Sequence, residues 1–309
     1  MGVLILGHFQ QQALGSEGDE RLEFQVCLAE CEDEICGFAD GTKSASLPLI
    51  LRLTGWSCQS NCKYGCMHRI HKRSAGVWEK YYGKWPFIRV LGIQEVFSVL
   101  FSIGNGWAHW KGWQLVVSQV GKNSSSHWMF PLYRQYFYSS MLTWCFSTVF
   151  HARDVWLTEK LDYFGAAWGI FIFCHLTICR TLQIRDPELQ DRLMSFFQFG
   201  FFLHICKMIF HSFDYAYNMV LLSVVGGVSI SLWIFWWAFM VDEVTKAKNR
   251  RVNYPVWCVL LFVASTVMLE IRDFPPLWGW LDAHSLWHLS TIPITLKWYE
   301  FYAQDVLMP

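Results

Sequence analysis

Long apolar runs follow one another along the chain after residue 86, separated by short polar segments. Each run is close to the ~20 residues that a helix needs to cross the hydrocarbon of a bilayer. The pattern therefore predicts an all-α membrane protein in which residues 87–305 form a bundle of seven transmembrane helices. The predicted spans are residues 90–110, 131–150, 162–181, 193–211, 215–240, 255–272 and 283–303.

The first part of the chain has a different pattern. Residues 16–86 are polar and rich in Cys, Gly and charged residues, and they contain no apolar run long enough to span a membrane. We predict that residues 21–86 form a small domain outside the membrane, which needs cross-links because so short a segment buries little core. Residues 1–20 are interpreted as a weak or truncated signal region, since Met1–Gly15 has a very short apolar core and no basic n-region.

The composition supports a membrane protein. Of the 309 residues, 53% are hydrophobic, 18% are aromatic and only 16% are charged, whereas soluble domains average about 25% charged residues. Many of the 18 Trp lie beside the apolar runs, as in the aromatic belts at membrane interfaces. The formal net charge is zero, so no basic field favours nucleic acid as a partner. The oligomeric state is left open.

Six of the 11 Cys are clustered before the first apolar run. An even, clustered set beside a membrane domain indicates three disulfides in an oxidising lumen. The alternative is a structural zinc site, but the spacings lack the paired CxxC of a zinc ribbon. The disulfide connectivity cannot be deduced from the sequence. The clustered residues are Cys27, Cys31, Cys36, Cys58, Cys62 and Cys66.

The distribution of Lys and Arg among the loops predicts the orientation. The loops after the first, third and fifth runs are richer in basic residues than the opposite loops, and basic loops favour the cytosol. The N-terminus is therefore predicted to be luminal and the C-terminus cytosolic. Asn123-Ser124-Ser125 is a glycosylation sequon in a predicted cytosolic loop, so it should stay unmodified. The four basic residues after the fifth run are Lys246, Lys248, Arg250 and Arg251.

Polar residues that carry chemistry gather at one predicted end of the bundle. Ser147 and His151 end the second run, Asp162 opens the third, and His284 and His288 open the seventh. Residues four apart lie on one face of a helix, so both imidazoles of a His-x3-His pair can reach one ion. Three imidazoles beside a carboxylate and a hydroxyl favour a Zn²⁺ site with an open fourth position, suited to hydrolysis.

Each of these residues also has an ordinary structural interpretation. A histidine at a membrane end is usually an interfacial side chain, Asp162 would cap a helix, and Ser147 would bond back to its own helix. A triad of Ser147, His151 and Asp162 is a second catalytic hypothesis. It leaves His284 and His288 unused, and no GxSxG turn surrounds the serine. We therefore favour His151, His284 and His288 as metal ligands, with Asp162 and Ser147 as catalytic residues.

Other polar residues near the span ends are interpreted as helix caps, solvated charges or structural residues. Asp282 is expected to cap the seventh helix, whereas Asp154 and Glu159 are expected to be solvated loop charges. The histidines without a partner at helical spacing are interpreted as structural; they are His109, His175, His204 and His211.

Several motifs resemble a known family. The pattern Ser-x3-His, an Asp eleven residues later and His-x3-His in the last span resembles the CREST superfamily of seven-span hydrolases, which includes alkaline ceramidases and progestin/adiponectin-type receptors. Further motifs are similar to those of the family of post-GPI attachment to proteins factor three, a GPI-remodelling phospholipase family. The similarity runs from Cys27 to Tyr302. The motifs are WSCQSNCKYGC, GKWPF (Gly83–Phe87), FHARD, LTEKLDY, FDYAYN (Phe213–Asn218), DFPP (Asp273–Pro276) and DAHSLWHLSTIP.

The resemblance implies a reaction and a location. It implies zinc-dependent, phospholipase A2-type removal of the unsaturated sn-2 acyl chain from GPI-anchored proteins. The implied partners are GPI-anchored proteins, as the lipid substrate, and membrane lipids. Zinc on the three histidines would activate a water and polarise the ester, Asp162 would relay the proton, and Ser147 would support the oxyanion. The implied compartment is the Golgi membrane, with the endoplasmic reticulum as the alternative. A receptor without turnover and a chaperone or cargo factor for GPI-anchored proteins are the alternative functions.

Overall fold

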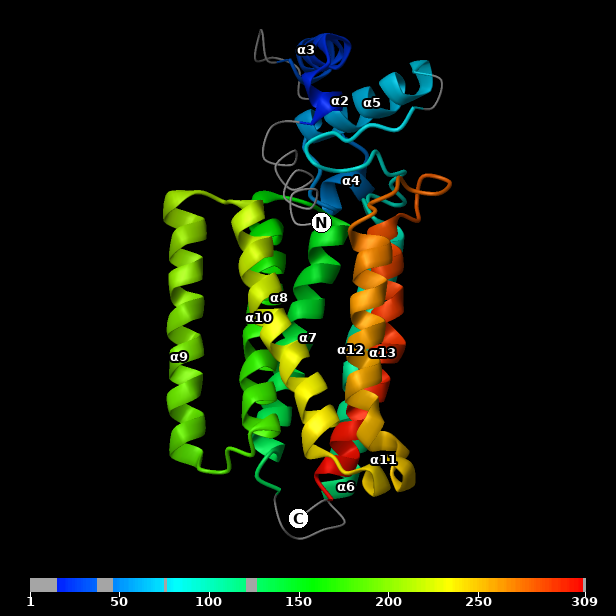
Figure 1. The fold of residues 1–309 in the computed structure, drawn as a ribbon. Helices are drawn as coiled ribbons and strands as arrows, with labels where there is room; N and C mark the ends of the chain where they lie inside the picture. Colours follow the sequence, from blue (N-terminus) through cyan, green and yellow to red (C-terminus); the bar gives the residue numbers. More distant parts are fainter. Residues whose placement is uncertain (1–15, 38–46, 75–76, 121–126, 308–309) are drawn as a thin grey trace.

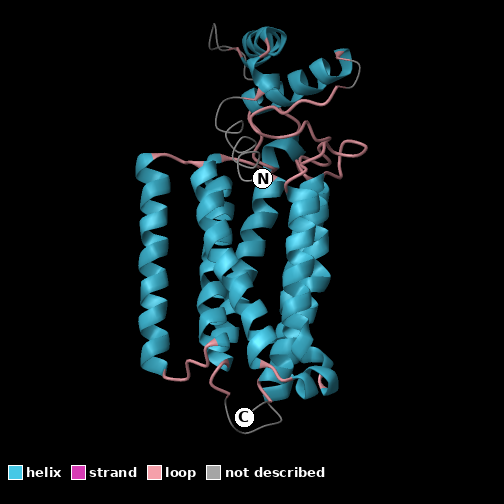
Figure 2. Ribbon diagram, viewed as in Figure 1, coloured by secondary structure: helices cyan, strands magenta, loops and turns pink. Residues whose placement is uncertain are grey.

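All seven apolar runs are helices in the computed structural model, which describes residues 16–37, 47–74, 77–120 and 127–307. Within these residues the fold is helical, and the only β-type pairs are isolated bridges (Figure 2). Residues 1–15 of the predicted signal region and Asn123 lie outside the described residues. The long helices are α6 (Val96–Val120), α7 (Phe130–Ala152), α8 (Trp156–Thr181), α9 (Pro187–Cys206) with the π-helix η1 (Lys207–His211), α10 (Tyr215–Phe235) with η2 (Trp236–Met240), α12 (Tyr254–Ser265) with η4 (Thr266–Glu270), and α13 (Ala283–Asp305).

Several helix boundaries differ from the predicted spans: α6 extends to Val120 rather than to residue 110, α9 begins at Pro187 rather than at residue 193, and two further starts are shifted. The first helix begins at Val96 rather than at residue 90, because Val90 and Ile93 close a tight turn through two backbone hydrogen bonds of 2.9 and 3.0 Å. Gly92 lies in that turn with φ of 87°, which glycine adopts without steric cost. The helix α8 begins at Trp156 rather than at residue 162, because the backbone N–H of Val155 donates to Thr158 Oγ1 at 2.9 Å and starts the helix there.

Among the described residues, four helices are long and apolar enough to cross a membrane. They are Trp156–Thr181, Pro187–His211, Tyr215–Met240 and Arg250–Glu270. The helices α6, α7 and α13 have 25, 23 and 23 residues and run alongside them (Figure 1), but they carry more polar side chains. Many of those polar side chains are buried, among them Ser102 and Asn105 of α6. Three of the predicted spans are therefore less apolar because they line a polar interior.

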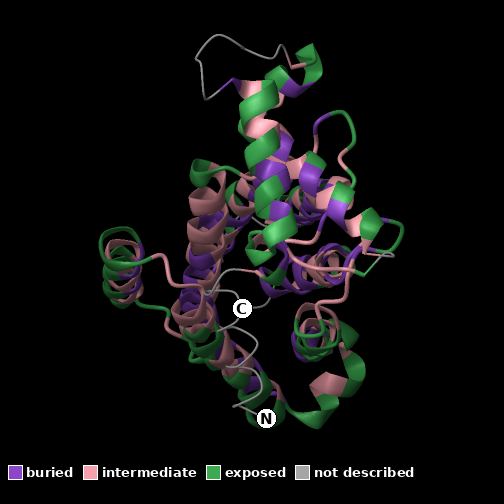
Figure 3. Ribbon diagram, turned by 90° about the horizontal axis from the view of Figure 1, so that it is seen from above, coloured by how far each residue is buried: buried purple, intermediate pink, exposed green. Residues whose placement is uncertain are grey.

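The helices pack in a closed order, with α6 between α7 and α13, α8 against α7 and α10, and α12 against α13. The helix α9 packs mainly on α8 at the edge of the bundle (Figure 1). Seen along the bundle, the buried residues gather toward the middle and the exposed residues face outward (Figure 3). Aromatic residues fill the half of this interior where α13 ends; Tyr133 stacks on Tyr302 with ring centroids 4.1 Å apart.

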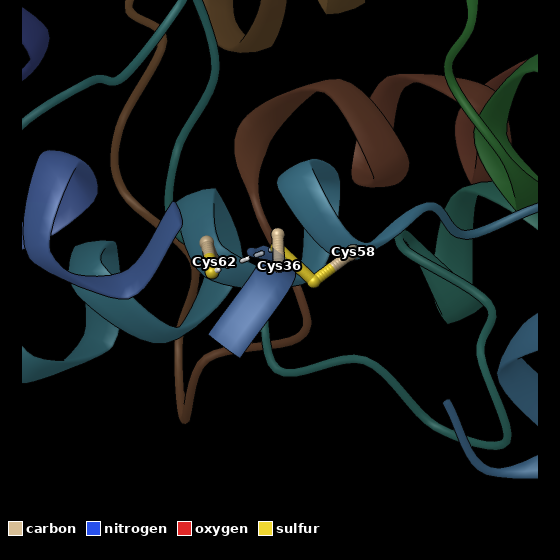
Figure 4. A group of neighbouring side chains, drawn as sticks. All are labelled: Cys36, Cys58 and Cys62. Atoms are coloured by element: carbon tan, nitrogen blue, oxygen red, sulfur yellow. Dashed lines mark hydrogen bonds between the residues drawn. A yellow bond between two sulfur atoms is a disulfide. The ribbon is translucent and has the colours of Figure 1, made fainter. Parts of the chain in front are cut away.

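In the part of the chain that the structure describes, four short helices gather at the other end of the bundle (Figure 1). They are α2 (Glu17–Glu20), α3 (Leu22–Cys36), α4 (Leu49–Leu53) and α5 (Cys58–Arg73). The prediction of three disulfides is confirmed, and all six clustered Cys are paired, so the structural zinc alternative is wrong. Figure 4 shows the bond between Cys36 and Cys58, with Cys62 beside it. The pairs are Cys27–Cys66, Cys31–Cys62 and Cys36–Cys58, all joining α3 to α5.

Candidate active site

The five predicted site residues come from helix ends that lie beside the disulfide-linked helices. His151 precedes the last residue of α7, and His284 and His288 lie in the first turns of α13 (Figure 1). Asp282 caps α13 as expected, because its carboxylate accepts from Ser285 N at 2.9 Å while Asp282 N donates to Ser285 Oγ at 3.1 Å. This cap fixes where the helix starts, and the two histidines that follow therefore face the same side one turn apart.

The three histidines converge. One ring nitrogen of each lies within 4.8 Å of the others. His284 Nε2 and His288 Nε2 are 2.9 Å apart, and the ring of His151 lies 5.2 Å and 5.1 Å from those two rings. Within the described chain, the buried Nε2 of His151 has no hydrogen-bond partner. A buried polar atom without a partner is costly, so this nitrogen has the surroundings expected of a metal ligand.

The other nitrogen of each ring is held by a neighbouring side chain. His151 Nδ1 lies 2.6 Å from Glu95 Oε2, His284 Nδ1 lies 2.9 Å from Glu270 Oε2, and His288 Nδ1 lies 3.1 Å from Ser102 Oγ. Nδ1–H groups that donate to these oxygens leave the Nε2 lone pairs free, which is the usual arrangement around metal-binding histidines. Three such imidazoles are a donor set that Zn²⁺ accepts, so the residues present fit that ion.

Sequence reasoning gave no role to Glu95, Glu270 or Ser102. Glu95 lies 56 residues from His151 in the chain, so no short motif connects the two side chains. The available signal was the position of Glu95 and Glu270 as isolated carboxylates at the ends of apolar runs. Intramembrane and interfacial carboxylates of this kind default to a functional role.

Ser147 is buried and lies next to Ser102. The two hydroxyl oxygens are 3.1 Å apart, and Ser102 also contacts His288, so it bridges Ser147 to a predicted ligand. The interpretation that Ser147 bonds back to its own helix does not describe this contact. The triad hypothesis is also unsupported, because His151 Nδ1 is bonded to Glu95 and its Nε2 is bonded to no serine.

Asp162 lies in the second turn of α8, which begins at Trp156. It therefore does not cap the helix, and that interpretation is wrong. The ionisable groups with which its carboxylate interacts electrostatically include His151 and His284. Asp162 is thus close enough to His151 and His284 to interact with them electrostatically, and it is not the N-cap of α8.

Asp154 was expected to be a solvated charge; its side chain is partly exposed, but it also forms an ion pair that was not predicted. Its Oδ2 lies 3.1 Å from the ammonium of Lys84, which also lies 2.6 Å from Glu95 Oε1. Burial lowers the pKa of Lys84, but the two carboxylates outweigh this effect and the net pKa is raised above the ordinary value. Burial likewise opposes the charge of Glu95, yet Lys84 and His151 hold the pKa of this carboxyl well below its usual range. Lys84 and Glu95 are therefore both ionised.

Among the described residues, the two carboxylate–histidine pairs of the site differ in exposure. The side chains of His151 and Glu95 are 3% and 6% exposed, whereas those of His284 and Glu270 are 34% and 30% exposed. Glu270 ends η4 and His284 lies in the first turn of α13, so the more exposed pair lies where these two helices approach each other.

Among the other histidines, His109 bonds to Tyr299 and His175 to the Gln190 carbonyl, which agrees with their structural interpretation. His211 lies beside Ser212 Oγ. His204 is buried, and neither of its ring nitrogens has a hydrogen-bond partner within the described chain.

Comparison with known proteins agrees with the motifs. The model of the Per1-like family matches residues 48–306. The chain is 33% identical over 308 residues to GPI-specific phospholipase A2-like PGAP3 of Danio rerio, which covers 96% of this chain and 92% of the relative. It is 32% identical to the protein of the same name from Homo sapiens, over 99% of this chain and 94% of the relative.

A fungal protein is similar to the same extent. The chain is 34% identical over 304 residues to "Protein PER1 homolog" of Schizosaccharomyces pombe, which covers 94% of this chain and 87% of the relative. No solved structure matches the chain at a significant level. The resemblance to the family of post-GPI attachment to proteins factor three is confirmed by these matches. The chain belongs to the Per1-like family.

Proposed function

We propose that this protein remodels GPI anchors by hydrolysing the ester of the unsaturated sn-2 acyl chain of GPI-anchored proteins. The observation that carries the proposal is the convergence of three imidazoles whose Nδ1 atoms are held by Glu95, Glu270 and Ser102. The names of the relatives, which are GPI-specific phospholipase A2-like proteins, support the same substrate class.

The proposed reaction assigns a role to each residue. His151, His284 and His288 would hold Zn²⁺, which supplies a Lewis acid for the ester carbonyl and activates a water. Asp162 would accept the proton of that water and pass it to the leaving alkoxide. Ser147 would act through its hydroxyl contact with Ser102, either by orienting His288 or by donating to the developing oxyanion. The ester would enter on the exposed side, next to His284.

The membrane arrangement is part of the proposal. We place all seven helices across the bilayer, with α6, α7 and α13 carrying the polar interior, and we place the disulfide-linked helices in the lumen. The three disulfides support an oxidising compartment, and the basic residues of the loop that folds as α11 (Glu243–Lys248) and η3 (Arg250–Asn253) support a cytosolic position for the opposite end. The Golgi membrane is proposed, with the endoplasmic reticulum as the alternative.

The test is hydrolysis by the purified full-length protein in lipid nanodiscs that contain a GPI lipid labelled in its sn-2 chain. Release of labelled fatty acid together with a lyso-GPI product is expected. The label should remain on the lipid with the His288→Ala variant. A wild-type protein that binds the lipid without releasing fatty acid would instead favour a receptor, chaperone or cargo factor.

A further inference from the structure

One tight turn lies between the disulfide-linked helices and the site. Tyr81 N donates to Lys84 O at 2.8 Å, and Lys84 N donates to Tyr81 O at 3.0 Å, so these residues close a two-residue turn. Tyr82 and Gly83 have φ of 51° and 80°, the positive values that a type I′ turn requires. Glycine adopts such a φ without steric cost. The turn therefore fixes the spacing between Tyr81 and Lys84.

Tyr81 belongs to the interior of the disulfide-linked helices. We call this interior the disulfide core. The ring of Tyr81 is buried, and its centroid lies 5.0 Å from that of Phe24. The packing of the core fixes this end of the turn. The disulfide core consists of Phe24, Cys27, Leu28, Cys62, Cys66, Ile70 and Tyr81.

Lys84 extends from the other end of the turn to the site. Its Nζ lies 2.6 Å from Glu95 Oε1, and the second oxygen of this carboxylate lies 2.6 Å from His151 Nδ1. The backbone adds a further contact, because Glu95 N donates to the carbonyl of His151 at 3.1 Å. A continuous series of contacts therefore joins the disulfide core to a predicted metal ligand.

We propose that Lys84 is a positioning residue for the metal site, and that the disulfide core acts through it to hold His151 in a metal-binding orientation. The inference rests on the proposed function, because it takes His151 as a ligand. Lys84 binds one oxygen of Glu95 and so keeps the other oxygen on His151 Nδ1. Without Lys84 the carboxylate can rotate, and the imidazole loses its fixed orientation. Such outer partners typically change metal affinity by about 10- to 100-fold.

A second lysine of the same segment provides a matched control. Lys80 forms an ion pair with Asp273, which also accepts a hydrogen bond from Trp85 Nε1 at 3.0 Å. Both lysines therefore attach this segment to the helical bundle. Among the described residues, only the hydrogen-bond and ion-pair contacts of Lys84 continue to one of the three converging histidines, so Lys80 serves as the control for weaker attachment of the segment.

The experiment measures zinc loss to a chelator from the zinc-loaded, full-length protein in nanodiscs. Lys84→Met should lose zinc about tenfold faster or more, while Lys84→Arg should restore most of the retention because it keeps the charge and the contact with Glu95. Lys80→Met should stay within about twofold of wild type, since it leaves Glu95 and His151 untouched. Equal acceleration in Lys84→Met and Lys80→Met would overturn the proposal.

A double-mutant cycle tests the route through Glu95. In a Glu95→Gln background, Lys84→Met should accelerate zinc loss by much less than it does in wild type, because the link is already broken. Acceleration by the same factor in both backgrounds would contradict the route. A wild-type protein that holds zinc but releases no fatty acid would refute the proposed function, and the zinc measurement would still decide the role of Lys84.

Discussion

Glu270 Oε2 lies 2.9 Å from His284 Nδ1, with both side chains about one-third exposed. The equivalent contact between Glu95 and His151 is 2.6 Å long and almost fully buried. The same carboxylate–imidazole arrangement therefore occurs once where water reaches it and once where water does not. Solvent screens the charge of Glu270 more than the charge of the buried Glu95. The two carboxylates should therefore differ in how much they contribute to metal binding.

The two carboxylates should respond differently to loss of charge. Glu95→Gln should weaken zinc binding by about 10- to 100-fold, and Glu270→Gln should weaken it less, because solvent already screens the charge of Glu270. Competitive zinc titration of the two purified variants measures both affinities. An equal loss, or a larger loss for Glu270→Gln, would contradict the argument from burial.

Loss of any one of the three histidines should remove the metal and the activity together. His151→Ala, His284→Ala and His288→Ala are each expected to insert into the membrane normally but to lose zinc and acyl hydrolysis, because a tetrahedral site needs all three protein ligands. His204→Ala is the control, since His204 is also a helix histidine but is not part of the converging group. Zinc per protein and lyso-GPI release decide the outcome. Full zinc and full activity in the three variants would refute the site.

Asp162 should be separable from the metal ligands. Asp162→Asn is expected to retain most of its zinc yet turn over at least about 100-fold more slowly, the loss typical of a removed general base. Zinc content and single-turnover hydrolysis should be measured on the same preparation. Parallel loss of zinc and rate would show that Asp162 holds the site together and does not move a proton.

A buried ion pair should stabilise the opposite end of the bundle. Arg180 Nε lies 2.9 Å from both carboxylate oxygens of Asp305, which also accepts a hydrogen bond from Tyr133. Asp305→Asn should lower the free energy of unfolding by about 3–5 kcal/mol, because it leaves a buried guanidinium without a countercharge. Glu300→Gln removes the exposed pair with Lys297 on the same helix, and it should cost less than ~1 kcal/mol. Denaturation in mixed micelles compares the two variants, and similar losses would contradict the prediction.

The orientation can be tested without activity. Asn123 should carry no glycan in the native protein, because its loop is predicted to be cytosolic. The six paired cysteines should resist thiol reagents until the protein is reduced. Mass spectrometry of the native protein measures both properties. A glycan on Asn123 would overturn the orientation.

Periodicity along one helix was enough to predict much of the site. The spacing of His284 and His288 placed both imidazoles on one face, and the apolar runs predicted every long helix. The contacts with Glu95, Glu270 and Ser102 could not be predicted, because they join different helices and depend on how those helices pack. Side chains that meet through tertiary packing need not stand at any fixed spacing in the sequence.

Charged loop residues were the least predictable. Asp154 follows α7 in a polar loop and looks solvated in sequence, yet it forms an ion pair with Lys84, 70 residues earlier in the chain. The disulfide-linked helices lie over this end of the bundle (Figure 1), where the Asp154 side chain is partly exposed and paired with Lys84. Helix starts were also shifted where a side chain outside the apolar run provided the cap, as Thr158 does for α8.

The three disulfides have a nested order, which determines how they can form. Cys36–Cys58 encloses the shortest loop, of 22 residues, and the other two pairs enclose it at separations of 31 and 39 residues. The entropic cost of closing a loop rises with its length, and each inner bond shortens the path that the next bond must close. The cysteines therefore pair most easily in the order Cys36–Cys58, Cys31–Cys62 and Cys27–Cys66, and each bond brings the next two cysteines of α3 and α5 closer together. The outermost pair, Cys27–Cys66, packs with Tyr81 in the disulfide core, so the last bond to form in this order is the one that completes the support for Lys84.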